Sequence, residues 1–265
     1  MKITKPLFLL FFIFVSQTCL ADQEKPAADP CNNFSANNII RVGSGHVLAP
    51  FHYFKEGKPT GLDIEIIKLV FAKAGFCFVY VSTPSSARSM QEMKQGRIDM
   101  LFSASYTAQR GEFSYFSIPY RDETIAIFWQ PTPNTKIDNL TNLQAMLDNK
   151  LRGVINLGGY YGAEVTNLLK DKNKQLHQVN SIARRMKMLL AKRVDFIIED
   201  EISGKYYLKQ HHITTMKMHP YLVNQDHVAF MFSKKTFSQK QLTRINNAIK
   251  ACKDDIARIV KRYKA

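Results

Sequence analysis

Arg110 is the residue of this 265-residue chain whose type and setting point most directly to chemistry. It lies in the stretch SYTAQRGEFSYFSIPY, residues 105–120, three residues after Thr107 and among aromatic and small polar side chains. A guanidinium presents a planar set of donors that matches a carboxylate in a bidentate pair. The stretch is therefore compatible with an ordinary surface arginine or with a docking point for a carboxylate ligand, and the surrounding elements must decide between them.

The elements that would position Arg110 are predicted to alternate between strands and helices. GLDIEIIKLVFAKAG has apolar residues at helical spacing and ends at Gly75, a typical helix stop. Strand-like runs are visible in FCFVYV, RIDMLFSA, RGVINL, RVDFIIED and HVAFMFS, and residues 239–264 are expected to form one or two closing helices. Strands that alternate with helices are typical of α/β layers around largely parallel sheets, so the predicted fold class is α/β.

Two segments share a pattern in which a short helix leads into a strand with a polar end. They are QGRIDMLFSA and AKRVDFIIED. Ligands of open α/β sheets bind beyond the carboxyl ends of the strands. Two such units facing each other predict a cleft with Arg110 on one wall and an acid on the other. The chain is expected to leave the first lobe near residues 122–126 and to return near residues 219–226.

The N-terminus has the order of a secretory signal peptide. Lys2 and Lys5 precede an apolar run from Leu7 to Val15, and small residues around Ala21 suit cleavage there. The run is too short to span a bilayer as a helix. Export to the periplasm as a soluble, monomeric protein is therefore expected.

The basic excess of the chain is spread along it. The formal net charge is +15, and removal of Lys2 and Lys5 leaves +13. The densest clusters, Arg184-Arg185-Lys187 and Lys261-Arg262-Lys264, lie on helix-like segments and are expected to be solvated faces. This distribution argues against a nucleic-acid-binding protein.

The cysteines and histidines give no metal-site pattern. Cys31, Cys77 and Cys252 remain after residue 21. Cys77 lies in an apolar strand and is expected to be a buried free thiol, which leaves a possible Cys31–Cys252 disulfide; the alternative is three unrelated thiols. His211, His212, His219 and His227 lack the Cys or acid that would complete a tetrahedral site at usual spacing, so neither metal nor cofactor is expected.

Four stretches in the expected order resemble the bacterial periplasmic solute-binding proteins of the polar amino-acid type. They are RVGSGHVLAPFHYFKEGKPTGLDIEIIKLVFAKAG, QGRIDMLFSASYTAQRGEFSYFSIPY, LRGVINLGGYYGAEV and KRVDFIIEDEISGKYYL. The similarity covers roughly residues 38–264. It implies a two-lobed type II fold with two crossings and a ligand cleft between the lobes. The implied organisation is a signal peptide at 1–21, an irregular leader at 22–37, lobe 1 at 38–124 and 223–265, and lobe 2 at 125–222.

The resemblance also implies roles for individual residues. Arg110 would bind a ligand carboxylate, and Asp200 would bind its ammonium, although Asp200 is equally placed to cap the helix that follows. Asp63 is expected to cap or brace its helix rather than touch the ligand. Where some receptors for basic amino acids carry an acid after the first strand, this chain has Gly45. The further predicted ligand contacts are Ser103, Ser105, Thr107, Gly159, Tyr160 and Phe51, the last with loop packing as an alternative.

The function implied by the resemblance is capture of an amino acid or related zwitterion for an ATP-driven importer in the inner membrane. A sensor subunit without transport is one alternative. The other is a dehydratase-like enzyme on the same fold, in which Asp200 or Glu199 would act as the acid or base.

Overall fold

The structure is a computed structural model that describes residues 31–45, 47–132, 137–170 and 175–264. The predicted signal peptide and most of the leader lie outside these residues. No helix within the described ranges is both long and apolar enough to cross a bilayer. The elements in chain order are η1 Ala36–Asn38, β1 Ile39–Ser44, β2 Tyr53–Lys55, β3 Lys58–Thr60, α1 Leu62–Ala74, β4 Cys77–Ser82, α2 Ser86–Lys94, β5 Met100–Ala104, α3 Ala108–Phe113, β6 Ser114–Phe116, β7 Arg121–Trp129, η2 Ile137–Asn139, α4 Leu143–Asp148, β8 Gly153–Ile155, α5 Ala163–Lys170, β9 Leu176–Gln178, α6 Ile182–Leu190, β10 Phe196–Asp200, α7 Glu201–Gln210, β11 Lys217–Ser233, α8 Gln239–Ala251 and α9 Lys253–Lys264.

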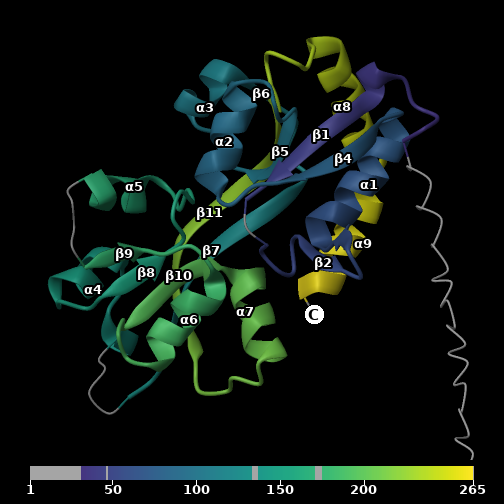
Figure 1. The fold of residues 1–265 in the computed structure, drawn as a ribbon. Helices are drawn as coiled ribbons and strands as arrows, with labels where there is room; N and C mark the ends of the chain where they lie inside the picture. The colour runs from purple at the N-terminus through teal and green to yellow at the C-terminus, as the bar shows by residue number, and fades with distance from the viewer. Residues whose placement is uncertain (1–30, 46, 133–136, 171–174, 265) are drawn as a thin grey trace, which may run out of the picture.

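The molecule has two α/β lobes, as the sequence predicted. In the first lobe β1 lies parallel to β4 and β5, and α1, α8 and α9 cover this part of the sheet (Figure 1). In the second lobe β8 lies parallel to β9 and β10, with α4 to α7 around them. The fold class and the cleft between two lobes are confirmed; the residue bounds given above for the lobes stay a prediction.

Two long strands join the lobes. β7 and β11 run antiparallel to each other from Arg121 paired with Val228 to Trp129 paired with Lys217. Beyond Val228, β11 pairs with β5 and β6 of the first lobe, whereas β7 pairs with β10 of the second lobe from Ile125 onward. The strands therefore follow one hydrogen-bonded path, β4-β1-β5-β11-β7-β10-β8-β9, that passes through both lobes.

Helix α1 illustrates how the sequence fixes the core of the first lobe. Its apolar residues at helical spacing are fully buried, Ile66, Ile67, Val70 and Phe71 among them. Gly75 ends the helix in the left-handed conformation at φ 72°, where a residue without Cβ is favoured. The predicted helix end is confirmed.

The cysteine pairing differs from the expectation. Cys31 and Cys77 form the disulfide, with Cα atoms 5.6 Å apart, and Cys252 is the buried free thiol. Cys77 opens β4, so its side chain meets the segment that leads into β1, the parallel neighbour of β4. Cys252 follows α8 and packs in the apolar core of the first lobe. The disulfide therefore ties the N-terminal segment to the sheet and not to the last helices.

Candidate functional site

A cleft of about 180 Å³ lies between the lobes at the carboxyl ends of β1, β5, β8 and β10. This is the place that the topology of parallel strands predicts. Seven of the eight predicted ligand residues line it; Thr107 is the one that does not. The acidic and guanidinium side chains that line it are those of Arg110, Arg121, Glu123, Arg185, Glu199 and Asp200.

Arg110 lies on α3, on the wall formed by the first lobe. The hydroxyl of Thr107 caps this helix by accepting a hydrogen bond from the backbone nitrogen of Arg110 at 3.2 Å, so Thr107 positions Arg110 instead of lining the cleft. Arg110 donates from Nη1 to the carbonyl oxygen of Ser105 at 2.8 Å, and its guanidinium lies 5.9 Å from the ring centre of Tyr160. No ion pair within the described residues involves Arg110. Burial lowers the pKa of Arg110, against the charge of Glu123.

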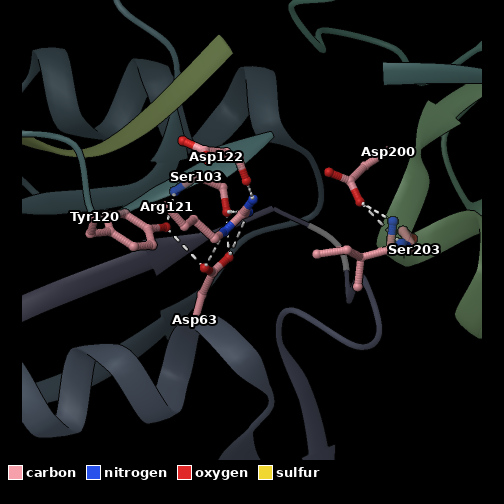
Figure 2. Close-up of polar contacts among 8 residues, drawn as sticks. Asp63, Ser103, Tyr120, Arg121, Asp122, Asp200 and Ser203 are labelled. Carbon is pink, nitrogen blue, oxygen red and sulfur yellow. Dashed lines mark hydrogen bonds and ion pairs between the residues drawn. The ribbon is translucent and has the colours of Figure 1, made fainter. Parts of the chain in front are cut away.

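Asp200 lies on the opposite wall, where β10 ends and α7 begins. Its Oδ1 caps α7 by accepting hydrogen bonds from the backbone nitrogens of Ile202 at 2.7 Å and Ser203 at 3.1 Å. Its Oδ2 is buried and has no hydrogen-bond partner among the described residues. Figure 2 shows this second oxygen turned away from the helix. The predicted helix cap is thus confirmed, and the same carboxylate keeps one acceptor for another group.

Burial raises the pKa of Asp200 to about 6, although the charge of Arg121 acts in the opposite direction. A buried acceptor without a partner destabilises a protein by roughly 1–3 kcal/mol. A donor supplied by a ligand would remove this penalty, and a cationic donor would also stabilise the ionised carboxylate.

Ser103 belongs to a buried network under the cleft (Figure 2). Its hydroxyl donates to Asp63, and its backbone nitrogen donates to the Tyr120 hydroxyl at 3.0 Å. Both donors that were expected to face a ligand are therefore used by the protein. Asp63 also accepts from Tyr120 at 2.9 Å and from Arg121 Nε at 3.0 Å. Asp63 therefore braces residues beneath the cleft and does not cap its own helix, which begins after Gly61 without a side-chain cap.

Arg121 is a residue of the site that the motifs did not reveal. Its side chain is 1% exposed and makes four hydrogen bonds, two with Asp63, one with the Ser103 hydroxyl at 2.8 Å and one with the carbonyl of Asp122 at 3.2 Å. Its guanidinium also lies 4.5 Å from the ring centre of Phe51. Phe51 is fully buried and lines the cleft, so it has both the cleft position and the packing role that were considered for it.

Arg185 corrects the prediction of a solvated basic face. Arg184 and Lys187 are exposed, but Arg185 is 0% exposed and forms an ion pair with Glu199. Arg185 also donates from Nη1 to Asn156 Oδ1 at 3.1 Å and to the carbonyl of Val179 at 2.9 Å. The pair fixes the loop after β8 and neutralises Glu199 on the wall of the second lobe.

The glycine turn after β8 brings the second lobe close to the first. Gly158 adopts φ 78°, and a Cβ built on it would lie 3.6 Å from the backbone nitrogen of Ala87 on α2. The Gly159 nitrogen donates to the Asn156 carbonyl at 3.3 Å within the turn, and the Tyr160 ring faces Arg110.

A second contact between the lobes lies near α7. Ser203 Oγ donates to the carbonyl oxygen of Ala49 at 3.1 Å. The lobes therefore meet through α7 as well as through the glycine turn, and the cleft lies between these contacts.

The four histidines considered above for a metal site, residues 211, 212, 219 and 227, do not form a cluster. His219 is buried against the carbonyl of Ile137, and His227 lies on the surface beside Asp122. The described residues hold no group of three His, Cys, Asp or Glu side chains that could bind a metal ion.

Comparison with known proteins identifies relatives over most of the chain. The profile of the bacterial extracellular solute-binding proteins, family 3, matches residues 40–265. A probable histidine-binding protein of Campylobacter jejuni is 26% identical over 181 residues, which is 68% of this chain and, at 66%, just under two thirds of that protein.

Solved structures show the same fold at low sequence identity. The arginine-, lysine-, histidine-binding protein ArtJ of Geobacillus stearothermophilus superposes with a TM-score of 0.69 at 19% identity, covering 84% of this chain and 94% of that chain. A histidine kinase sensor domain with similarity to periplasmic binding proteins superposes with a TM-score of 0.71 at 16% identity. The superposition covers 85% of this chain and 95% of that domain.

Proposed function

Because the chain belongs to family 3 of the bacterial extracellular solute-binding proteins, we propose that it binds an amino acid or a related small zwitterion between its two lobes. The observation that carries this proposal is the pair formed by Arg110 and Asp200. Arg110, which has no ion pair among the described residues, lines the cleft from the first lobe, and Asp200, whose buried Oδ2 has no partner among them, lines it from the second.

Each of the two groups suits one end of a zwitterion. Arg110 offers a fork of N–H donors to a carboxylate, and Tyr160 lies beside its guanidinium. Asp200 offers Oδ2 to an ammonium, while the hydrogen bonds from α7 to Oδ1 hold the carboxylate in place. Seclusion from water strengthens both interactions.

Ligand binding is proposed to close the cleft by rotation of the lobes. A zwitterion that touches Arg110 and Asp200 together makes contacts that an open arrangement does not offer. Only such differential affinity shifts a conformational equilibrium. In this structure Ser203 of α7 donates a hydrogen bond to Ala49 of the other lobe, and Gly158 lies near Ala87.

A thermal-shift screen combined with small-angle X-ray scattering tests this proposal. An amino acid present at about 100 times its Kd should stabilise the protein by about 2.7 kcal/mol, which raises the Tm by about 5–10 °C for a chain of this size. The same amino acid should lower the radius of gyration, whereas amines without a carboxylate serve as controls and should do neither. If no amino acid raises the Tm, or if a tight ligand leaves the radius of gyration unchanged, the proposal is wrong.

Replacement of Asp200 by Asn should lower the affinity for α-amino acids by tenfold or more. The affinity for carboxylates without an ammonium should stay nearly unchanged. The reason is that the amide removes the negative charge but preserves an acceptor for capping α7. With wild-type protein, affinity for amino acids should fall as the pH drops below about 6, because protonation of Asp200 removes the same charge. Titration calorimetry between pH 5 and pH 8, chosen as a window of about 1–2 units around that pKa, measures both effects.

Glu201 supplies the matched control for this substitution. It follows Asp200 on α7, but it forms a surface ion pair with Lys205 and does not line the cleft. Glu201→Gln removes the same charge and should leave affinity within about twofold, a difference of under 1 kcal/mol. Equal losses in the two variants would exclude a specific role for Asp200.

Delivery to an ATP-driven importer in the inner membrane is the proposed physiological role, with the mature protein in the periplasm after removal of residues 1–21. The likeness to a histidine kinase sensor domain supports a sensor as the alternative. Uptake of labelled ligand by cells that lack the gene separates the importer receptor from the sensor. Loss of the gene should abolish uptake if the protein is an importer receptor and should leave uptake intact if it is a sensor. Of the two acids considered for the dehydratase alternative, Arg185 holds Glu199 as an ion pair, so Asp200 is the acid that remains for it.

A further inference from the structure

The charges that line the cleft do not cancel when each is assigned to its partner. Arg185 is paired with Glu199, and Arg121 is paired with Asp63 just behind the lining. Of the six lining charges, Arg110, Glu123 and Asp200 then remain without an ion pair among the described residues. A zwitterion satisfies one cation and one anion. One carboxylate is left over.

Glu123 is brought to the cleft by the alternation of β7. Side chains two residues apart lie on the same face of a strand, and Arg121, Glu123 and Ile125 all line the cleft. Ile125 pairs with Asp200 across β7 and β10. Glu123, two residues along, is therefore a diagonal neighbour of Asp200, at a backbone separation of about 7–8 Å. A single ligand can reach both carboxylates.

The two arginines nearest to Glu123 do not neutralise it. Arg121 uses four of its donors for Asp63, Ser103 and Asp122. Arg110 donates to the Ser105 carbonyl from its own wall and makes no ion pair with Glu123. The remaining charged neighbours, Asp200, Asp63 and Asp226, are themselves acids.

We propose that Glu123 is a specificity-determining residue that receives a second cationic group of the ligand, so that the cleft selects amino acids with a net positive charge over neutral ones of the same size. This inference rests on the proposed function, because it assumes that Arg110 and Asp200 hold the carboxylate and the α-ammonium.

The position of Glu123 implies that ligand binding is coupled to loss of a proton from its carboxyl group. Burial raises its pKa to about 8; Arg121 acts against this shift, and Asp200, Asp63 and Asp226 add to it. The phenol of Tyr161 and the guanidinium of Arg110 also interact electrostatically with it. At pH 7, one unit below that value, Glu123 is mostly the neutral acid before ligand binds, and it becomes the extra carboxylate counted above when a cation arrives. A ligand cation placed beside it would displace the proton, so binding should release up to about one proton and strengthen as the pH rises toward 8.

Titration calorimetry with two matched ligand pairs tests the inference. L-arginine and L-citrulline differ by a guanidinium against a neutral urea, and L-lysine and L-2-aminoheptanoic acid differ by an ammonium against a methyl group. Wild-type protein should bind the cationic member of at least one pair about tenfold or more tightly than its neutral partner. Glu123→Gln should bring that affinity ratio close to one, because it weakens binding of the cationic ligand only. Its affinity for the neutral member should change by less than about threefold.

Asp122→Asn is the control, since Asp122 is the adjacent acid of β7 and faces solvent beside His227. It removes the same formal charge from the opposite face and should leave the ratio unchanged. Calorimetry at pH 7 in two buffers of different ionisation enthalpy gives the second readout. Proton release should accompany the cation in wild type and in Asp122→Asn, and should be lost in Glu123→Gln.

The outcomes separate this inference from the proposed function. If wild-type protein binds the neutral ligand as tightly as the cation, or if Glu123→Gln keeps the preference, the role of Glu123 is wrong while amino-acid binding stands. If amino acids of neither kind bind, both ideas fail.

Discussion

Replacement of Arg110 by alanine should abolish measurable binding of amino acids while the protein stays folded. Removal of one member of a charge-assisted pair in a closed interface weakens binding by roughly 2–5 kcal/mol, which is about 30-fold to several thousand-fold in Kd. Arg110 has no ion pair within the described residues, so its loss leaves no protein carboxylate uncompensated. Calorimetry with the best ligand of the thermal-shift screen measures the effect, and circular dichroism checks the fold.

Two further variants make this result specific. Arg110→Lys keeps the charge but loses the planar fork, so its affinity should fall between those of wild type and Arg110→Ala. Arg88→Ala removes an arginine of α2 that pairs with Glu92 outside the cleft lining, and it should bind like wild type. An Arg110→Ala protein that binds within about threefold of wild type, under 1 kcal/mol, would contradict the assignment of Arg110.

Replacement of Asp63 by alanine should lower the free energy of unfolding by about 3–5 kcal/mol, the usual effect of leaving one partner of a buried ion pair alone. Asp63 is 0% exposed and accepts hydrogen bonds from Ser103, Tyr120 and Arg121. Without it, the Arg121 guanidinium stays buried and loses its counter-charge. Urea denaturation followed by circular dichroism and by fluorescence measures the loss.

The double variant Asp63→Ala/Arg121→Met is the internal test of this explanation. Methionine fills the space under Phe51 without a charge, so the double variant should be more stable than Asp63→Ala alone. Glu65→Gln on the same helix changes a surface contact with Arg262 and should shift stability by less than about 1 kcal/mol. If Arg121→Met fails to restore stability in the Asp63→Ala background, the buried charge is not the cause of the loss.

Much of the fold could be predicted because its signals are local. The α1 helix and its stop at Gly75 follow from apolar spacing and one glycine, and the strands that carry the site follow from short apolar runs. The part of β11 before His227 was missed, because its apolar run from Tyr221 to Val223 is only three residues long and directly follows Pro220. This segment is a strand because β7 pairs with it over its length, which is a tertiary effect.

The candidate site could be predicted where a residue carries its own motif. Arg110 and Asp200 were found in this way, and both line the cleft. Arg121, Glu123 and Arg185 carry no such motif. The alternation of charged residues in β7 was the available signal for the first two, since residues 121, 123 and 125 share a face. Arg185 was assigned to solvent from its basic neighbours, although its spacing from Ile182 and Leu189 places it at the edge of the apolar face.

The cysteine pairing shows what a single sequence does not contain. Three cysteines allow three pairings, and only the register of β1 against β4 brings Cys77 next to the chain at Cys31. That register is set by contacts between distant segments. Local patterns carry no information about it.

The ladder between β7 and β11 is the part of the molecule that the proposed rotation of the lobes would deform. Two separate connecting strands could bend independently of each other. β7 and β11 cannot, because they are paired without a register shift from Asn224 to Val228. Such a ribbon is stiff in its own plane and compliant in torsion. The register shifts on either side of it, between Leu222 and Asn224 and between Ala229 and Met231, are where a sheet bends and twists most easily. The lobe rotation proposed above would therefore twist this ribbon, and Arg121 and Glu123 lie on the face of it that lines the cleft.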